Sequence, residues 1–317
     1  MEQRNLGRTG LQVSVVGLGC NNFGMRIDLE ASRAVVHRAL DLGITLFDTA
    51  DIYGNKGGSE TILGEILGSR RKDIVLATKF GMPMDADKGL MGASRRYIMQ
   101  AVEDSLRRLK TDWIDLYQIH QPDPRTPIEE TLRALDDLVR QGKVRYIGCS
   151  NFPAWQVADA MWMARYHNLT CFASCQDEYS LVVRHHEEHL IPAMQHFGLS
   201  LLPYFPLASG LLTGKYKRDS APAPDTRMGA MKRWADKYLT DANFDLVERL
   251  TKFAEVRGHS LLELAFGWLA SQPFVASIIA GATKPEQVEQ NVQAAEWRLT
   301  AEEMAEVDSI SRQVGAQ

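Results

Sequence analysis

The sequence predicts an α/β protein built as a closed (β/α)8 (TIM) barrel, with an N-terminal β-hairpin at the barrel bottom and extra helices near the C-terminus. Three observations lead to this prediction. Eight short apolar runs alternate with segments of helical period, which is typical of parallel strands joined by crossover helices. The runs are apolar almost throughout, as in strands that helices cover. Eight units in 317 residues favour a closed barrel over an open doubly wound sheet.

The elements follow in order along the chain. The predicted strands cover residues 13–18, 43–47, 74–78, 113–119, 144–149, 170–174, 199–203 and 275–280. Helical period begins near residue 30 and recurs over residues 60–67, 94–109, 127–139, 153–163 and 261–269. Residues 4–13 predict the hairpin, and residues 206–238 predict a long polar loop after the seventh strand. No linker divides the chain, so we expect a single domain over residues 1–317.

Three capping boxes predict where helices begin. They pair Thr126 with Glu129, Ser260 with Glu263, and Thr283 with Glu286. An N-cap at Thr283 would present free backbone amides and the positive end of a helix dipole to an anion, and Lys284 adds a charge.

Composition excludes several classes of protein. Lys and Arg number 36 against 40 Asp and Glu, so a net charge of −4 offers no basic surface for nucleic acid or a membrane. No apolar run approaches the ~18 residues of a membrane span, and the polar start carries no apolar signal segment. The four cysteines lack metal-site or redox spacing, which indicates reduced thiols and a cytoplasmic protein. They are Cys20, Cys149, Cys171 and Cys175.

Polar residues follow the predicted strands where each strand ends. Functional side chains of a parallel barrel gather at these carboxyl-terminal ends. In chain order they are Asp48, Lys79, His120, Ser150, Asn151, Gln176 and Tyr204, with Tyr53 in the loop after Asp48. Because the strands converge at one mouth, we expect these side chains to lie close together.

Four of these residues form a set that suits carbonyl reduction. The phenol of Tyr53 has an ordinary pKa of ~10, too high for efficient proton donation at neutral pH. A neighbouring Lys79 ammonium would lower that pKa, and the Asp48 carboxylate would keep the ammonium charged and in place. His120 would orient a carbonyl oxygen. Taken one at a time, each residue also fits a structural role.

A dinucleotide would have to bind without the Rossmann fingerprint. Gly17 and Gly19 follow the first strand, but the third glycine of the G-x-G-x-x-G pattern is replaced by Asn22. The sequence therefore excludes a Rossmann phosphate loop at this position.

The motifs at the strand ends resemble the aldo-keto reductase superfamily, most of all bacterial members related to potassium-channel β subunits. The matching segments are residues 47–54 with 58–60, 77–80, 115–120, 147–152, 204–216 and 281–291. The resemblance runs in order over nearly the whole chain. It implies a small-molecule carbonyl substrate and NADP(H) extended across the barrel mouth, with Tyr53 as general acid, Lys79 and Asp48 tuning it, and His120 orienting the carbonyl.

The resemblance also implies positions for the cofactor and the substrate. Ser150, Asn151 and Gln176 would bind the nicotinamide carboxamide, and Tyr204 would stack on the ring. The other implied cofactor contacts are Gly19, Cys20, Asn21, Asp48, Phe205, Pro206, Leu207, Ser209, Leu211, Lys215, Gly281, Thr283, Gln287, Gln290 and Asn291. Apart from the resemblance, Arg218 and Arg227 in the long loop after the seventh strand are available to a cofactor phosphate. The implied substrate pocket comprises Phe23, Tyr53, Phe80, His120, Gln121 and Phe152.

Three positions depart from the family pattern. Phe205 stands where many members carry serine, which removes one hydroxyl from the pyrophosphate path. Gln287 stands where some members place an arginine on the 2′-phosphate, and Gln290 replaces a commoner glutamate. NADPH is the expected cofactor, and use of NADH stays open.

Three other readings compete with a reductase. His185, Glu188 and His189 match the H-x-x-E-H spacing of a zinc metallopeptidase, but no third ligand stands out, so we expect no metal. A barrel aldolase would use Lys79 as a Schiff-base nucleophile and leave Tyr53 unexplained. An NADP(H)-binding redox sensor with slow or no turnover also fits the resemblance. Substrate identity, reaction direction and oligomeric state have no signature in the sequence.

Overall fold

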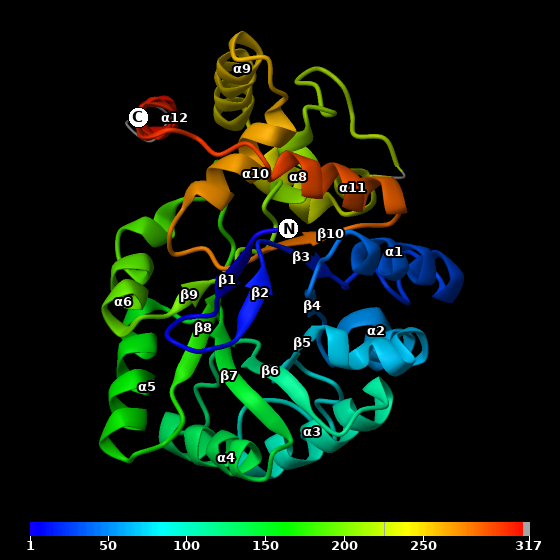
Figure 1. Ribbon diagram of the computed structural model, residues 1–317, viewed down its shortest axis with the longest axis vertical. Coiled ribbons are helices and arrows are strands. Elements are labelled where there is room, and N and C mark those ends of the chain that lie inside the picture. The colour runs from blue at the N-terminus through cyan, green and yellow to red at the C-terminus, as the bar shows by residue number, and fades with distance from the viewer. Residues whose placement is uncertain (225, 313–317) are drawn as a thin grey trace.

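The computed structural model describes residues 1–224 and 226–312. Its centre is an eight-stranded parallel sheet in the order β10-β3-β4-β5-β6-β7-β8-β9, ringed by helices (Figure 1). The strands are β3 (Val16–Gly19), β4 (Leu46–Asp48), β5 (Val75–Phe80), β6 (Ile114–Ile119), β7 (Val144–Ser150), β8 (Phe172–Gln176), β9 (Ser200–Leu201) and β10 (Ile278–Gly281).

Parallel bridges close the sheet into a barrel. Leu201 pairs with Val275, and Tyr204 pairs with Ile279, so the last two strands meet beyond their regular ladders. The Leu201 amide donates to Phe274 O at 2.8 Å across this seam. The predicted (β/α)8 barrel is confirmed.

Helices cover the outside of the barrel, as the apolar strands require. The helices of the β/α units are α1 (Leu29–Asp41), α2 (Tyr53–Leu67), α3 (Arg95–Leu109), α4 (Ile128–Arg140), α5 (Ala154–Tyr166), α6 (Leu190–Phe197), α10 (Leu261–Ser271) and α11 (Pro285–Ala294). Two extra helices, α9 (Asp241–Val256) and α12 (Ala301–Arg312), pack against each other, as expected near the C-terminus. No helix in the described ranges is long and apolar enough to cross a membrane.

The hairpin closes one end of the barrel. Strands β1 (Gln3–Asn5) and β2 (Gln12–Ser14) pair antiparallel, as predicted from residues 4–13. Leu6 and Val13 are fully buried in the cluster inside the barrel, beside Leu46 and Val75 at the starts of β4 and β5. The barrel bottom is therefore filled by side chains. The predicted first strand was too long, because Val13 belongs to β2 and the barrel strand begins at Val16.

Residues 206–238 are not the unstructured loop that their polarity predicted. They contain η3 (Ala208–Thr213), α7 (Arg227–Ala230) and α8 (Lys232–Tyr238). Elsewhere in the chain, η1 (Gly68–Asp73) and η2 (His185–Glu187) are also short 3-10 helices. Trp234 packs edge-on against Phe205, with ring centroids 4.9 Å apart, and Lys237 pairs with Glu178 at 2.5 Å. These contacts fasten the segment to the barrel mouth.

Of the three predicted capping boxes, one is confirmed. Ser260 and Glu263 exchange the expected hydrogen bonds at the start of α10. The N-cap of α4 is Pro127 and that of α11 is Lys284, and neither start has a side-chain cap. Thr126 bonds Asp123 and Thr283 bonds Gln287, because nearby side chains compete for the hydroxyls.

Candidate active site

The predicted site residues lie together at the carboxyl-terminal ends of the strands. Asp48 is the last residue of β4, Lys79 is next to last in β5, and His120 directly follows β6. Ser150 ends β7 and is paired in register with Gln176 at the end of β8. Parallel strands that end at one rim place all five side chains at the barrel mouth.

Lys79 is the centre of the arrangement. Its side chain has no exposed surface, and Nζ donates to Asp48 Oδ2 at 2.6 Å, to Thr49 O at 2.9 Å and to Tyr53 Oη at 3.5 Å. Burial favours the neutral amine, but the Asp48 carboxylate and the Tyr53 oxygen outweigh it and raise the pKa of Lys79. The ammonium is therefore permanently charged at neutral pH, which argues against a Schiff-base nucleophile.

Two glutamines hold the other oxygen of Asp48. Gln176 Nε2 donates to Asp48 Oδ1 at 2.8 Å, and Gln118 Nε2 lies 3.4 Å from the same atom. Gln118 is next to last in the mostly apolar strand β6, and the sequence analysis did not identify it. The one feature that could have revealed its role is that a polar residue stands in β6 at the position paired with Lys79 of β5.

Tyr53 follows a sharp turn and begins α2. Its backbone N–H donates to Ala50 O at 3.1 Å, and the next four residues, 54–57, all have φ between +58° and +107°. This left-handed run separates Tyr53 from the regular part of α2 and directs its side chain toward Lys79 and His120. The Tyr53 and His120 rings meet edge to face, with centroids 5.7 Å apart.

Burial has the largest influence on the phenol. It raises the pKa of Tyr53, and the Lys79 ammonium only partly offsets that increase. The expectation that Lys79 would bring the pKa below its ordinary value is wrong for this site, since desolvation of the phenolate is the stronger effect. Tyr53 therefore carries its proton throughout the neutral range.

His120 is neutral. Burial, helped by the Lys79 charge, lowers the pKa of His120 to about 3. Its Nδ1 atom is buried and has no hydrogen-bond partner in the described part of the chain. A neutral imidazole beside a protonated phenol suits hydrogen bonding to an uncharged carbonyl oxygen.

The residues predicted to bind a carboxamide contact one another. Asn151 has φ of +60°; its Nδ2 donates to His120 O at 2.9 Å and its Oδ1 accepts from Tyr204 Oη at 2.8 Å. Ser150 Oγ donates to Gln176 O at 2.7 Å. These bonds join the ends of β6, β7 and β8 to the bridge after β9.

Basic and polar groups surround the segment predicted to hold the pyrophosphate. Ser209 is buried with its hydroxyl beside that of Tyr238, in a turn where residues 208–210 all have positive φ. Lys215 Nζ lies against Gly210, 3.0 Å from where a Cβ would stand. Arg227 places its guanidinium 5.2 Å from the Phe205 ring centre.

The first and last predicted cofactor segments meet beside Arg227. Gly19 pairs in register with Gly281, and a Cβ on Gly281 would lie 3.3 Å from Asn21 Oδ1. Asn22 links the two segments: its Nδ2 donates to Ala282 O at 3.2 Å and its Oδ1 accepts from Arg227 Nη2 at 3.2 Å.

The adenosine-end residues lie around the start of α11. Gln287 Oε1 accepts from Thr283 N at 2.8 Å, so this glutamine caps the loop rather than projecting freely. Lys284 is exposed, as is Gln290, while Asn291 is buried. Thr283 is not the N-cap that its pattern predicted, but the amino end of this ten-residue helix does lie here.

Some predicted contacts are too deeply buried to touch a ligand. Phe23 and Phe80 have no exposed surface, and Phe80 packs on Tyr117 with ring centroids 4.7 Å apart. We therefore correct the predicted substrate pocket by removing both. The side chains of Cys20 and Leu211 also lie in the core and offer a cofactor only their backbones. Apolar residues at strand and turn ends do not reveal from sequence alone which face they occupy.

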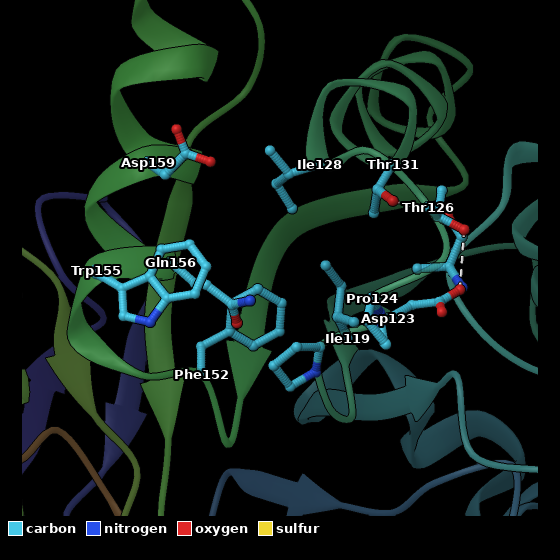
Figure 2. A pocket seen from close by; sticks show the side chains of 12 residues that line it. Ile119, Asp123, Pro124, Thr126, Ile128, Thr131, Phe152, Trp155, Gln156 and Asp159 are labelled. Atoms are coloured by element: carbon cyan, nitrogen blue, oxygen red, sulfur yellow. Dashed lines mark hydrogen bonds between the residues drawn. The ribbon is translucent and has the colours of Figure 1, made fainter.

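Phe152 lines a separate hollow outside the barrel. The hollow, about 320 Å³, lies between the starts of α4 and α5, where Phe152, Trp155 and Ile128 converge (Figure 2). Gln121 is exposed on the loop between this hollow and His120. Of the six predicted pocket residues, the structure therefore gathers Tyr53 and His120 at the mouth, with Gln121 at its rim.

The metallopeptidase pattern is not on one helix. His185 lies in η2, whereas His189 comes directly before α6, so the two do not share a helical face. No group of three metal-ligating side chains occurs within residues 1–224 and 226–312. Arg184 instead pairs with Glu187 and Asp308, which gives this segment a structural role.

The comparisons with known proteins agree with the barrel fold. Residues 15–312 match the model of the aldo/keto reductase family, so the chain belongs to this family. Aldo/keto reductases are oxidoreductases of carbonyl compounds that use nicotinamide cofactors, and this chain is an enzyme of that class.

Similar proteins carry different names. A probable voltage-gated potassium channel subunit beta of Oryza sativa subsp. japonica is 37% identical over 98% of this chain and 96% of its own length. The uncharacterized oxidoreductase YrpG of Bacillus subtilis is 36% identical over the same shares, 98% and 96%. The L-glyceraldehyde 3-phosphate reductase of Escherichia coli is 33% identical over 97% of this chain and 92% of its own.

Proposed function

We propose that the protein reduces an aldehyde or ketone to an alcohol with NADPH, and that Tyr53 is the general acid. The observation that carries the proposal is the buried chain Asp48–Lys79–Tyr53, with Nζ 2.6 Å from the carboxylate and 3.5 Å from the phenol oxygen. Neutral His120 stands at the edge of the same ring. This set offers a carbonyl oxygen one proton donor and one further polar contact.

The residues at the mouth fit a dinucleotide diphosphate. Ser209 supplies a buried hydroxyl, and Lys215 beside Gly210 and Arg227 beside Phe205 supply positive charge. Lys284 and the amino end of α11 would hold a 2′-phosphate, which favours NADPH over NADH. Tyr204, fixed by Asn151, would support the nicotinamide ring.

Each protein group then has a defined task. When bound, NADPH supplies a hydride from nicotinamide C4. Tyr53 donates its proton to the substrate oxygen as negative charge develops there, and the Lys79 ammonium stabilises the phenolate that remains. Asp48 keeps Lys79 charged and fixed, and the neutral His120 hydrogen-bonds the carbonyl oxygen. Gln118 and Gln176 hold Asp48 in place.

The test is NADPH oxidation with a panel of small aldehydes, comparing the native protein with Tyr53→Phe. We expect the native protein to turn over and the variant to lose at least ~100-fold in kcat while binding NADPH normally. Tight NADPH binding by the native protein without turnover on any aldehyde would replace this proposal with the redox-sensing function. Undiminished turnover in Tyr53→Phe would remove Tyr53 from the acid role.

A further inference from the structure

A second buried acidic cluster lies behind the loop that carries Tyr53. Glu60, on α2, has no exposed surface; its Oε1 accepts from Thr78 Oγ1 at 2.6 Å and its Oε2 from Arg108 Nε at 2.7 Å. Asp51, two residues before Tyr53, is only 1% exposed and belongs to the same cluster. None of the roles assigned above uses either carboxyl group.

Asp51 is poorly compensated by its neighbours. Its Oδ2 accepts from Tyr97 Oη at 3.3 Å, while Oδ1 is buried and lacks a hydrogen-bond partner anywhere in the chain described. Asp48, by contrast, has a lysine and two glutamines. The one guanidinium of the cluster, on Arg108, is already bound to Glu60. A buried carboxylate with so few partners is costly, whereas a protonated carboxyl group is not.

We propose that Asp51 is a positioning residue for Tyr53 that acts in its uncharged form, and that a negative charge on Asp51 slows the reduction. This inference rests on the proposed function of Tyr53 as general acid. It assigns a role to a carboxyl group that contacts neither the substrate oxygen nor Lys79 Nζ.

The backbone carries the positioning effect. The Asp51 N–H donates to Lys79 O at 3.0 Å and the Tyr53 N–H to Ala50 O at 3.1 Å, so residues 50–53 form a turn fastened to β5. The side-chain bond to Tyr97 fastens the same turn to α3. Arg108 covers the left-handed run after Tyr53, since a Cβ on Gly57 would stand 2.6 Å from Arg108 Cδ.

The charges around Asp51 determine when it ionises. Burial and the Glu60 carboxylate raise the pKa of Asp51 to about 8, against the opposing effects of Arg108, the Tyr97 hydroxyl and the Ile52 backbone N–H. The groups that interact with it come from four elements. The titratable ones are Glu60 and Tyr53 on α2, Tyr97 and Arg108 on α3, and Tyr117 on β6; the fourth element is β5, where the Lys79 backbone carbonyl accepts from the Asp51 N–H.

Ionised Asp51 would weaken the acid. A negative charge at this position raises the pKa of Tyr53 further, so the phenol gives up its proton less readily. The pKa of His120 is about 3 and that of Tyr53 lies above its ordinary value of ~10, so neither changes charge near pH 8. A fall in reduction rate centred near pH 8 would therefore come from Asp51 or another buried carboxyl group.

Asp177 supplies the matched control. It too is a buried aspartate with one unpartnered oxygen in the part of the chain described, and burial raises its pKa to about 7. We would measure kcat for aldehyde reduction from pH 6 to 10 in the native protein, Asp51→Asn and Asp177→Asn. The expected fall near pH 8 persists in Asp177→Asn and disappears in Asp51→Asn. A fall that persists in Asp51→Asn, or disappears in Asp177→Asn, overturns the proposal.

A second measurement needs no turnover. The folded pKa of Asp51 lies above the unfolded value of ~3.9, so the folded chain holds the extra proton and loses stability as the pH rises from 4 to 8. The free energy of unfolding of the native protein, minus that of Asp51→Asn, should fall over this range and then level off. A flat difference means that Asp51 is already charged and the proposal fails, whatever the fate of the Tyr53 assignment.

Tyr97→Phe tests the same carboxyl group if Asp51→Asn does not fold. Loss of the hydroxyl removes a hydrogen bond that favours the charged form of Asp51. The pH at which the rate falls, and the pH at which the free energy of unfolding stops falling (the stability midpoint), should therefore both be higher than in the native protein. Midpoints that stay in place or move to lower pH contradict the assignment. If native turnover is absent but the stability midpoint moves as expected, the reductase proposal fails while the titration of Asp51 stands.

Discussion

Lys79 Nζ lies 2.6 Å from Asp48 Oδ2, and neither side chain has more than 4% of its surface exposed. The two charges come from adjacent parallel strands, β4 and β5, whose last residues point to the same rim. Breaking one partner of such a buried pair leaves an uncompensated charge, which costs ~3–5 kcal/mol. The pair therefore contributes to the fold as well as to the chemistry proposed for Tyr53.

Lys79→Met should lower turnover by at least ~100-fold, because the phenolate left on Tyr53 loses its ammonium. The same change should lower stability, since Asp48 stays buried with only amide donors. The double variant Lys79→Met/Asp48→Asn should regain much of that stability but none of the activity. Steady-state kinetics and chemical denaturation separate the two effects, and near-native kcat in Lys79→Met would refute the assigned role.

Asn151→Ala should weaken NADPH binding more than it raises the KM for the aldehyde, because Tyr204 loses its partner at 2.8 Å. Asn151 has φ of +60°, where alanine is strained and glycine is not. Asn151→Gly is therefore the matched control for backbone strain. Equal NADPH affinity in the glycine variant and the native protein, measured by fluorescence titration, would count against a role in cofactor binding.

Lys284→Met should narrow the preference for NADPH over NADH. The exposed ammonium at the amino end of α11 would contact the 2′-phosphate, which NADH lacks. Removing it should cost NADPH a few-fold to tenfold in Kd and leave NADH unchanged. Equal losses for both cofactors would place Lys284 on the shared diphosphate or outside the site.

His120 should make stability depend on pH on the acidic side. Its folded pKa is about 3 against ~6.5 when unfolded, so the unfolded chain binds more protons in between. Stability from this group is present above pH 6.5 and is lost as the pH falls toward 3, at up to ~1.4 kcal/mol per pH unit. His120→Asn should remove this slope in urea titrations from pH 4 to 7. An unchanged slope would assign it to other groups.

The sequence predicts the strands well because apolar runs, and the polar residues that follow them at the barrel rim, can both be seen in the sequence itself. It predicts helix N-caps poorly. The hydroxyls of Thr126 and Thr283 can bond either a backbone amide or a neighbouring side chain, and only the fold shows which side chain is near. Gln118 was missed for the same reason. A buried polar residue in an apolar strand has no period, and its partners lie on other strands.

Phe23 and Phe80 illustrate a different limit. Phe80 lies in one of the motifs that carry the family resemblance, Phe23 was named only as part of the substrate pocket, and both pack into the core. A motif marks the neighbourhood of the chemistry, but whether an aromatic ring faces the mouth or the helices depends on strand register and local bulges. Tyr53 faces the mouth because residues 54–57, which follow it, all have left-handed backbone conformation. Only two of these four residues, Gly54 and Gly57, are glycines, so the sequence indicates this conformation only in part.

Because Leu6 and Val13 fill the bottom of the barrel, we expect protons to reach Tyr53 from solvent only through the barrel mouth. Below Tyr53 lie the ion pair of Lys79 and Asp48, the two glutamines that hold Asp48, and the apolar cluster to which Leu6 and Val13 belong. In the proposed reduction, the proton that Tyr53 gives to the substrate would then be replaced from solvent at the mouth. In each turnover the alcohol product would have to leave the barrel mouth before solvent can reprotonate Tyr53. Product release and reprotonation of the general acid would therefore be coupled.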